Sequence, residues 1–533
     1  MQSISPSQPG SRRAFLRRAC AAGAGALVLG AMPRARAAAW PSDPFVLGVA
    51  AGSPSADGFA LWTRLAPDPL ANDPELPGGV RPDRYRVRYD VATDPAMRNV
   101  VRTGHAVAES TFGYSVHVEV GGLAAARPYW YRFSCRDAES RIGRASTLPA
   151  AQTDLVRLRL GVVSCSNYEH GYFSAYRHLA DEAPDYALFL GDYIYEHVEQ
   201  SATKVRTHSD GVEATTLPLY RNRYAQYRLD EDLQRLHAEV PTLVTWDDHE
   251  VQNDYADRWS ETFDDPTRFL QRRAAAYQAF YEHMPLRPSR SLPHGPSMRV
   301  YDRFRFGRLA EIALLDGRQF RSREACDVPP KGGGHTVSDA QCPERLDASR
   351  TMLGTEQERW LREGLARSQA LWNVLAQDVM IAELRERGPT GDVQHWTDDW
   401  NGYPAARNRL LRAIHDTGVR NPIALTGDIH SYWVNDLKLD FDAPDSPVVA
   451  TELVVTSVTS HPPPYEVFAR YAADNPHVRY FESRRRGYMT VLIEPRRLTT
   501  THRCVSDAAV RGASVETSKT LVVEEGRPGA VSA

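Results

Sequence analysis

The sequence predicts an α/β domain preceded by a small all-β domain, and two patterns support this prediction. Apolar and polar side chains alternate strictly over residues 84–91 and 114–120, which is the period of half-buried strands. Beyond about residue 154, short apolar runs alternate with helical patterns, as in α/β domains. A chain of 533 residues, 42% of them hydrophobic, is long enough to build two or three packed domains.

The all-β domain is expected over residues 42–147. After the two alternating segments, a third strand over residues 129–135 follows Leu123 and Pro128. The Leu, Pro and Tyr spacing, with Tyr131 and Phe133, resembles the tyrosine corner of immunoglobulin-like and fibronectin-type sandwiches. We therefore expect a β-sandwich, joined by a linker at 148–153 to an α/β domain over 154–525.

Four short apolar runs in the α/β region are each followed by side chains that can bind metal ions. The runs, which we expect to be buried strands, are residues 160–163, 186–190, 243–246 and 423–425. The side chains that follow them are Cys165; Asp192 and Tyr195; Asp247, Asp248 and His249; and Asp428 and His430. Because ligands of α/β sheets bind at the carboxyl ends of the strands, these groups predict one convergent metal site.

Each of these groups has a plainer interpretation when taken alone. A Gly-Asp pair is common in turns, a histidine can lie in a surface loop, and a tyrosine or cysteine can belong to the core. The occurrence of all four groups after apolar runs favours the metal site over four separate coincidences.

Two helices are predicted from local patterns. Residues 168–179, directly after the cysteine turn, are expected to be helical. A second helix is expected to begin at Thr355, because Glu358 three residues later completes a capping-box pattern. Leu361 and Leu365 then lie on one face of that helix.

The first 37 residues are expected to be a twin-arginine export signal, with a basic tail as the plainer alternative. Residues 11–17 read Ser-Arg-Arg-Ala-Phe-Leu-Arg, a weakly apolar stretch covers 21–32, and Ala-Arg-Ala at 35–37 suits signal peptidase. The stretch is too short for a membrane span of roughly 20 residues, and no comparable run follows it. We therefore expect the twin-arginine translocation machinery as a partner, a periplasmic or secreted location and no permanent membrane anchor.

The charge of the chain argues against a nucleic-acid-binding surface. Loss of residues 1–37 would remove six arginines and no acidic residue, so the formal charge would move from −3 to −9. A protein with this excess of acidic groups does not attract nucleic acid over its whole surface. Attraction for a phosphate group must come from local cations or from bound metal.

Six cysteines are too few for a disulfide-stapled scaffold of this length. Cys326 and Cys342 flank a Pro/Gly-rich loop, and the sequence leaves open whether they form a disulfide. Cys135 and Cys504 are expected to be buried thiols. Cys165 differs from them because it stands where a strand is predicted to end, which favours a ligand role.

The types of donor indicate which metals the site would hold. The thiolate of Cys165 and the phenolate of Tyr195 are unusual ligands for magnesium or zinc, yet such ligands stabilise ferric iron. Asp247, Asp248 and Asn253 offer hard oxygen donors that suit calcium, magnesium or manganese. The donor set therefore predicts one oxidised iron beside harder divalent ions.

Five further stretches make the chain resemble a known family. They are residues 167–173, 316–321, 350–354, 372–377 and 400–404, the last reading Trp-Asn-Gly-Tyr-Pro. Together with the strand-end groups, they are typical of PhoD-type alkaline phosphatases, within the calcineurin-like and purple-acid-phosphatase-like metallophosphoesterases. The resemblance covers nearly the whole chain. It implies a metallophosphoesterase sandwich of two mixed β-sheets flanked by helices, after a small immunoglobulin- or fibronectin-like domain.

The resemblance also implies a site that contains Fe³⁺ and Ca²⁺, with two calcium ions. Cys165 and Tyr195 would hold the iron, and Asp192 would bridge iron and calcium. The rest of the metal shell would be Asn253, Asp428 and His430, with the metal that each of the last two binds left open. An aspartate stands where the Asn-His-Asp/Glu motif of ordinary metallophosphoesterases has its asparagine, and Ala51-Gly52-Ser53-Pro54 departs from the expected Ser-Gly-Asp-Pro.

The activity implied by the resemblance is hydrolysis of phosphate mono- and diesters. A water activated by adjacent cations would attack phosphorus in line with the leaving oxygen, without a covalent phosphoenzyme. The candidate catalytic residues are His249, Asp248 and Arg318, since imidazole and guanidinium groups can stabilise charge on the phosphate. The alternative for Arg318 is a pair with Asp316, and the alternative for His249 is to orient a ligand.

Other functions stay open on the sequence alone. The same donors could serve a ferric redox enzyme, although hard oxygen donors beside them argue against it. The β-sandwich could instead bind phosphate or glycan while the α/β domain is inert. Within the phosphatase interpretation, monoesters, nucleotide diesters, phospholipids as in phospholipase D-like phosphodiesterases, and wall teichoic acid all fit. Residues 200–218 and 461–486 are candidates for the rim of the site. The basic run 484–486 could recognise a charged substrate, although a solvated or structural cluster is the more common meaning of such a run.

Overall fold

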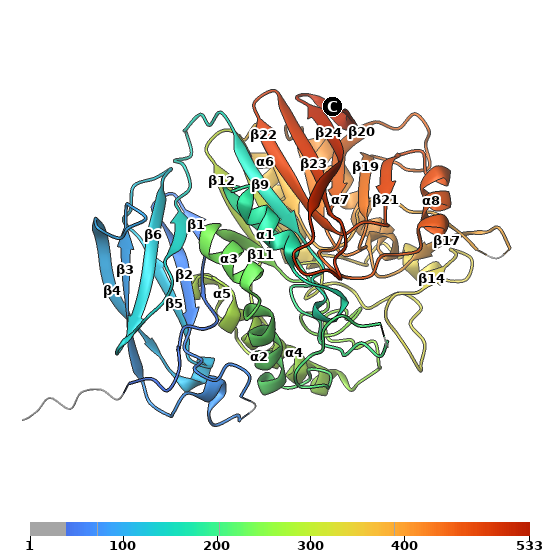
Figure 1. Ribbon diagram of the computed structural model, residues 1–533. Coiled ribbons are helices and arrows are strands. Elements are labelled where there is room, and N and C mark those ends of the chain that lie inside the picture. The colour runs from blue at the N-terminus through green and yellow to red at the C-terminus, as the bar shows by residue number, and fades with distance from the viewer. Residues whose placement is uncertain (1–38, 72, 202, 389) are drawn as a thin grey trace, which may run out of the picture. The chain divides into compact units, whose positions relative to one another are not determined.

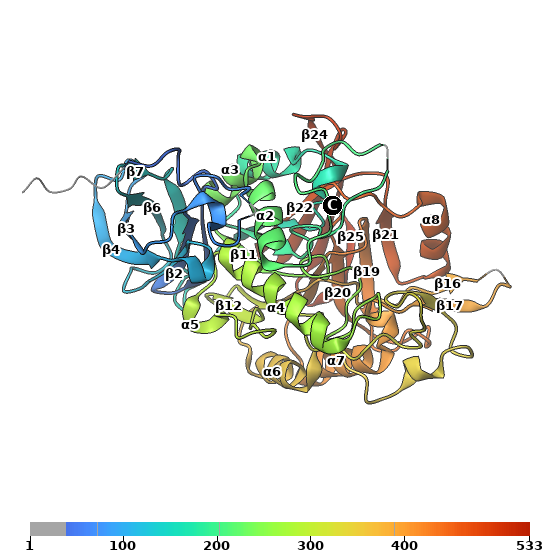
Figure 2. The same ribbon diagram turned by 90° about the horizontal axis from the view of Figure 1, so that it is seen from below.

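Two large mixed β-sheets form the centre of the protein (Figures 1 and 2). The computed structural model describes residues 39–71, 73–201, 203–388 and 390–533, so the expected export signal lies outside the described residues. Within that part of the chain, one sheet has ten strands and the other has seven. Residues 40–533 belong to one compact unit.

The order of the strands determines which loops meet. From edge to edge, the ten-stranded sheet contains β25 (Arg527–Ser532), β24 (Val515–Glu524), β23 (Arg497–Val505), β22 (Gly487–Glu494), β9 (Leu158–Val163), β10 (Tyr186–Leu190), β11 (Thr242–Thr245), β1 (Val49–Ser55), β2 (Gly58–Arg64) and β5 (Ser115–Val120). The seven-stranded sheet contains β12 (Asp302–Phe306), β13 (Ala310–Leu314), β15 (Trp372–Ala376), β18 (Pro422–Thr426), β20 (Val448–Val454), β19 (Tyr432–Lys438) and β21 (Val478–Glu482). Strands β9, β10 and β11 are parallel, as are β13, β15, β18 and β20. The loops at their carboxyl ends therefore gather at one edge of each sheet.

The two sheets share one apolar core. Along β10, Leu188 and Leu190 pack against side chains of the seven-stranded sheet, whereas Ala187 and Phe189 pack against helices. This is the two-residue period of a strand that is buried on both faces. Burial of each such leucine contributes roughly 2 kcal/mol to folding, so the strands that carry the polar loops are firmly held.

Helices cover the outer face of each sheet (Figure 2). Those on the ten-stranded sheet are α1 (Ser174–Asp181), α2 (Leu217–Arg228), α3 (Glu231–Glu239) and α4 (Pro266–His283), and α5 (Pro288–Ser291) is a single turn. Those on the seven-stranded sheet are α6 (Gly354–Arg367), α7 (Pro404–Thr417) and α8 (Tyr465–Asp474). No described helix is long and apolar enough to cross a membrane.

An all-β region forms the N-terminal part of the described chain, as expected (Figure 1). Its second sheet contains β4 (Val100–Ala108), β3 (Tyr85–Ala92), β6 (Pro128–Cys135), β7 (Ala138–Glu139) and β8 (Gly143–Ser146), and it packs against β1, β2 and β5. The hydroxyl of Tyr129 accepts from the N–H of Ala124 (2.9 Å) and lies 3.2 Å from its carbonyl oxygen. This contact with the backbone five residues upstream is typical of a tyrosine corner.

One sheet of the N-terminal region continues into the α/β region. Strand β1 pairs in parallel with β11 at Gly52 and Thr242. A Cβ on Gly52 would lie 2.8 Å from the carbonyl oxygens of Thr242 and Pro285, so this approach requires glycine. The regions expected at 42–147 and 154–525 therefore contribute to a continuous sheet, although their sequences suggest two separate domains.

The prediction of a helix over residues 168–179 is wrong for the first half of that segment. A 3₁₀ turn covers Tyr168–His170, and α1 begins only at Ser174. The two segments are separated because the backbone of Gly171 is fully extended, with φ of 175° and ψ of −175°, which no helix accommodates.

The helix α6 exists, but the predicted capping box at its start does not form. The helix begins at Gly354 rather than after Thr355. Instead, the hydroxyl oxygen of Thr351 accepts from the N–H of Gly354 (2.9 Å) and the hydroxyl donates to Glu358. Leu361 and Leu365 are buried, as the apolar pattern predicts.

Candidate metal centre

Glycine is required at two of the turns that carry the predicted ligands. Gly191 follows β10 with φ of 92°, and a Cβ there would overlap the Cβ of Asp247. Gly427 follows β18 in the other sheet, and a Cβ there would overlap the side chain of Ser164. Because neither glycine has a side chain, the turn after β10 can approach the turn after β11 in the same sheet, and the turn after β18 can approach the other sheet.

Four of the predicted ligands lie together between these turns. Donor atoms of Cys165, Asp192 and His430 all lie within 4.8 Å of one another. The hydroxyl of Tyr195 donates to Oδ2 of Asp192 (2.9 Å) and lies 3.1 Å from Nε2 of His430. These residues follow β9, β10 and β18, so three strands from both sheets contribute to one cluster, which we call the thiolate cluster.

The backbone is strained at four of the predicted ligand residues. The φ angle is 59° at Cys165, 52° at Asp192, 66° at Asp428 and 53° at His430. Residues with side chains rarely adopt this left-handed conformation, which costs on the order of 1 kcal/mol or more for each residue. Strain of this kind persists where the surrounding structure holds it in place, and here it coincides with the donor cluster.

The tautomer of His430 suits a ligand. Its Nδ1 lies 2.7 Å from the carbonyl oxygen of His461, and a carbonyl can only accept, so Nδ1 carries the proton. Nε2 therefore has its lone pair directed at the thiolate cluster. This arrangement, in which a backbone carbonyl orients a histidine, is common for histidines that bind metals.

A second group of donors adjoins the first. Donor atoms of Asp192, Asp248 and His249 also lie within 4.8 Å of one another, and Nδ1 of His249 lies 2.7 Å from the carboxylate of Glu196. Oδ2 of Asp248 accepts from the N–H of Asp254 (2.6 Å). Asp192 belongs to both groups, which is the position that a bridging carboxylate would occupy.

Asn253 and Asp428 lie beside these groups without a contact that tests their ligand roles. The backbone N–H of Asn253 donates to Glu196 (2.8 Å), and its side-chain amide donates to Glu261 (3.1 Å). The carbonyl oxygen of Asp428 accepts from the thiol of Cys165 (3.5 Å). Metal binding by Asn253 and by the carboxylate of Asp428 stays a prediction.

The electrostatics of the site fit bound cations. Burial, together with neighbouring carboxylates, raises the pKa values of Asp192, Asp247 and Asp428 well above the usual range. Burial likewise raises the pKa values of Cys165 and Tyr195. Among the described residues, one buried oxygen of Asp192 and one of Asp247 have no hydrogen-bond partner. A cation would favour the ionised form of all five groups and would satisfy both oxygens, so the donor set fits a metal centre.

Arg318 reaches the site, but its guanidinium group is buried and paired. Nε donates to Asp247 (2.5 Å), while Nη1 and Nη2 form a bidentate pair with Asp398 (2.6 and 2.8 Å). The contact of Arg318 with Asp316 is through its backbone N–H (3.1 Å), so the alternative pair between the two side chains does not form. The guanidinium group therefore fixes the carboxylate of Asp247.

Sequence reasoning missed several residues that hold the site in place. The carboxylate of Glu250 accepts from three backbone N–H groups, those of Asp192 (3.1 Å), Tyr193 (2.7 Å) and Asp247 (2.8 Å). The hydroxyl of Ser460 donates to that of Tyr195 (2.7 Å). Glu250 stands within the Trp-Asp-Asp-His-Glu cluster and could have been singled out, whereas no sequence signal marks Ser460.

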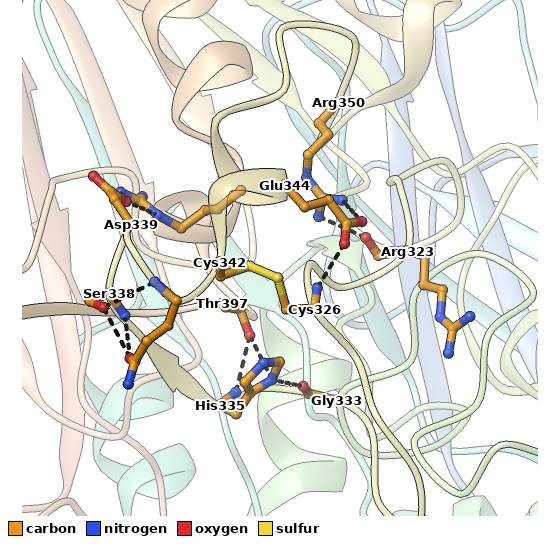
Figure 3. The surroundings of a disulfide bond; sticks show 12 residues. Arg323, Cys326, Gly333, His335, Ser338, Asp339, Cys342, Glu344, Arg350 and Thr397 are labelled. Atoms are coloured by element: carbon orange, nitrogen blue, oxygen red, sulfur yellow. Dashed lines mark hydrogen bonds and ion pairs between the residues drawn. A yellow bond between two sulfur atoms is a disulfide. The ribbon is translucent and has the colours of Figure 1, made fainter.

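A loop closed by a disulfide (Figure 3) contacts the second donor group through Asp254. Cys326 and Cys342 are bonded, which answers the question that the sequence left open, and Cys135 and Cys504 are buried free thiols, as expected. Within the loop, the N–H of Gly334 donates to Asp254 (2.8 Å), which in turn contacts Asp248. The loop also contacts Glu261, through Nζ of Lys331 at 3.5 Å and the N–H of Gly332 at 2.6 Å.

Comparisons with known proteins agree with this architecture. Residues 160–502 match the family model described as PhoD-like phosphatase, and residues 31–149 match its N-terminal domain model. Alkaline phosphatase D of Bacillus subtilis (strain 168) is 40% identical over 495 residues, which are 92% of this chain and 82% of that protein. The solved structure described as "Structure of PhoD" is 40% identical, covers 93% of each chain and gives a TM-score of 0.86.

Proposed function

Because the chain belongs to the PhoD-like phosphatase family and is therefore a phosphoric ester hydrolase, we propose that it is an exported phosphatase and phosphodiesterase with one ferric iron and two calcium ions. The observation that carries this proposal is the thiolate cluster, in which Cys165, Asp192 and His430 have donor atoms within 4.8 Å of one another. The hydroxyl of Tyr195 contacts two of these three residues. Family membership sets aside the redox enzyme and the non-catalytic binding protein.

The donor types divide the site between two kinds of cation. Cys165 and Tyr195 would hold the iron, because thiolate and phenolate favour the ferric state, and Asp192 would bridge iron and calcium. The remaining donors would be Asn253, Asp428 and His430, with Asp248 beside them. When bound, the cations would neutralise charge on the phosphate and lower the pKa of a water molecule that attacks phosphorus.

His249 is suited to contact a phosphate oxygen or to protonate the leaving group. Glu196 fixes its ring through Nδ1 (2.7 Å), and the ring lies next to Asp192 and Asp248. Burial by itself would lower the pKa of His249, but the carboxylates of Asp248 and Glu196 raise that pKa well above its usual value. The contact with Glu196 holds the ring beside the predicted metal ligands, where a protonated ring could donate to a substrate oxygen.

Asp248 and Arg318, the other two candidate catalytic residues, differ in their contacts. Asp248 lies among the donors with two backbone N–H groups on its carboxylate, from His249 (2.9 Å) and Asp254 (2.6 Å). The guanidinium group of Arg318 donates its hydrogen bonds to Asp247 and Asp398. We therefore assign Arg318 to positioning Asp247 rather than to contacting phosphate.

Export through the twin-arginine pathway completes the proposal. That route moves folded proteins, so a chain with residues 1–37 as its signal would load its metals before it crosses the membrane. The disulfide between Cys326 and Cys342 suits an oxidising destination.

Metal analysis and turnover of two substrates would test the proposal. Purified protein should contain iron and calcium, should hydrolyse p-nitrophenyl phosphate and bis-p-nitrophenyl phosphate, and should show a broad visible band from tyrosinate bound to ferric iron. Cys165→Ala and Asp192→Asn should lose iron and turnover together. Cys504→Ala, which removes a buried free thiol outside the site, is the matched control and should lose neither. Retained turnover in Cys165→Ala after complete loss of iron would refute the iron assignment.

A further inference from the structure

A small pocket opens beside the thiolate cluster. It has a volume of about 180 Å³ and is lined by His170, His461, the basic run 484–486 and the loop 505–509. His461 connects the pocket to the cluster, because its carbonyl oxygen accepts from Nδ1 of His430 (2.7 Å). The rings of His170 and His461 stack with centroids 3.8 Å apart and form one wall. We call this cavity the Arg486 pocket.

Two of the three arginines of the pocket are already paired. Arg484 forms a bidentate pair with Glu482 (2.7 and 3.0 Å), and its side chain is 60% exposed. Arg485 pairs with Glu516, which lies on β24. These two guanidinium groups therefore add little net charge to the pocket.

Arg486 differs from both neighbours. In the described part of the chain, no carboxylate oxygen lies within 4.0 Å of its guanidinium nitrogens, so it forms no ion pair there. Its Nη2 is 3.4 Å from Nδ1 of His461. Asp507 lines the same pocket, but its Oδ1 accepts from the N–H of Ala509 (2.8 Å). Asp507 attracts Arg486 from beyond ion-pair distance. The half-buried guanidinium group therefore has an electrostatic neighbour but no direct ion pair in the described chain, and an anion that binds it directly would relieve part of the cost of its burial.

The two histidines of the pocket supply hydrogen bonds rather than charge. The N–H of His461 donates to Nδ1 of His170 (3.2 Å), so Nε2 of His170 carries its proton and donates to Glu199 (3.0 Å). Nδ1 of His461 faces Nη2 of Arg486 (3.4 Å), a group that can only donate, so Nδ1 accepts and neither ring carries two protons. Arg486 is thus the cation that would attract an anion into this cavity.

We propose that the Arg486 pocket is a subsite for a second phosphate group of the substrate, so that the enzyme favours phosphate esters whose leaving group carries a further phosphate. The inference rests on the proposed function, because it places the scissile phosphate at the metal centre. The planar guanidinium fork matches two phosphate oxygens. His461 lines the pocket and contacts the predicted ligand His430, so the pocket adjoins the metal centre where the scissile phosphate would bind.

A matched pair of substrates would test the subsite. Propane-1,3-diol monophosphate and propane-1,3-diol bisphosphate differ only in the second phosphate, and phosphate release from each gives kcat and KM for the metal-loaded protein. We expect Arg486→Gln to raise KM for the bisphosphate about tenfold and to leave kinetics of the monophosphate unchanged. Arg486→Lys, which keeps the charge, should recover part of the loss. Arg497→Gln, which breaks an exposed pair with Glu494 outside the pocket, is the control and should leave both substrates unaffected.

Calorimetric titration of the bisphosphate separates failure of the subsite from failure of the proposed function. Tighter binding of the bisphosphate than of the monophosphate, lost in Arg486→Gln, would support the subsite even if neither compound were hydrolysed. Equal affinity for both compounds in the unmodified protein would overturn it. Inhibition by added inorganic phosphate that is not competitive and disappears in Arg486→Gln would also overturn it, since the occupant would then be free phosphate.

Discussion

His430 donates its Nδ1 proton to the carbonyl oxygen of His461 (2.7 Å), and this hydrogen bond connects the predicted metal centre with the neighbouring Arg486 pocket. It orients the ring so that Nε2 lies 3.1 Å from the hydroxyl of Tyr195. A displacement of the segment that carries His461 would therefore change the orientation of the predicted ligand His430. The site depends on such contacts between segments that are distant in the sequence.

Ser460→Ala should weaken the iron site without destroying it. The hydroxyl of Ser460 donates to the oxygen of Tyr195 (2.7 Å), and its loss makes the phenolate more basic and less well oriented. Loss of such an outer contact costs roughly tenfold or more in metal affinity or activity. We expect a shifted visible band and weaker iron binding, measured by titration with a chelator. Ser532→Ala, at the exposed end of β25, should change neither, and an unaltered band in Ser460→Ala would contradict the prediction.

Gly427→Ala should disturb the approach of the two sheets. The added methyl group would overlap the side chain of Ser164 next to Cys165, and repacking costs on the order of 1–3 kcal/mol. We expect a lower unfolding midpoint in urea and a reduced iron content. Gly121→Ala is the control, because a Cβ there meets no atom within 4 Å. Equal stability of the two variants would show that the loops can separate without cost.

Arg318→Met should reduce stability more than substrate affinity. It removes the partner of two buried carboxylates, Asp247 and Asp398, and such a loss costs about 3–5 kcal/mol. We expect a large fall in the free energy of unfolding and a lower kcat, with KM for p-nitrophenyl phosphate nearly unchanged. Arg497→Gln, which breaks an exposed pair with Glu494, should cost less than about 1 kcal/mol. A large rise in KM would instead indicate that Arg318 contacts phosphate.

Opening the disulfide should loosen the second donor group. Cys326 and Cys342 are 16 residues apart, and closure of a loop of that length contributes roughly 3 kcal/mol in the chain-entropy model. We expect Cys326→Ser/Cys342→Ser to lower the unfolding temperature and to weaken calcium binding, because the loop holds Asp254 through Gly334. Cys135→Ser removes a free thiol of the N-terminal region and should leave calcium affinity unchanged. Unaltered calcium affinity in the double variant would show that the loop does not support the site.

Removal of the metals should make stability depend on pH. Burial raises the pKa of Glu250 to about 7 and that of Asp254 to about 8. A carboxyl group with a raised pKa in the folded state favours folding at low pH, and this contribution is lost as pH rises through the folded value. We therefore expect chelator-treated protein to unfold at a lower temperature at pH 8.5 than at pH 5.5. The unfolding temperature of metal-loaded protein should fall less between these two pH values. A metal-free protein that is more stable at pH 8.5 than at pH 5.5 would contradict the raised pKa values of these carboxyl groups.

Local patterns were enough to place the ligand-bearing strands. The apolar runs before Cys165, Asp192, Asp247 and Asp428 correspond to β9, β10, β11 and β18, because a buried strand needs little beyond its own apolar side chains. Helix starts were less predictable. The cap of α6 comes from Thr351, which lies before the helix in a loop whose shape no local pattern reveals.

The sequence by itself determined the strands, the family and the kinds of donor that the site contains. Only the tertiary structure decided which donors meet. Asp192 belongs to both donor groups, and Arg318 pairs with Asp247 and Asp398 rather than with Asp316. The pairing of β1 with β11 was likewise decided by the tertiary structure. The physical reason is that periodicity reports which face of a segment is buried. Contacts between segments far apart in the chain depend instead on the packing of two whole sheets, which no short stretch of sequence encodes.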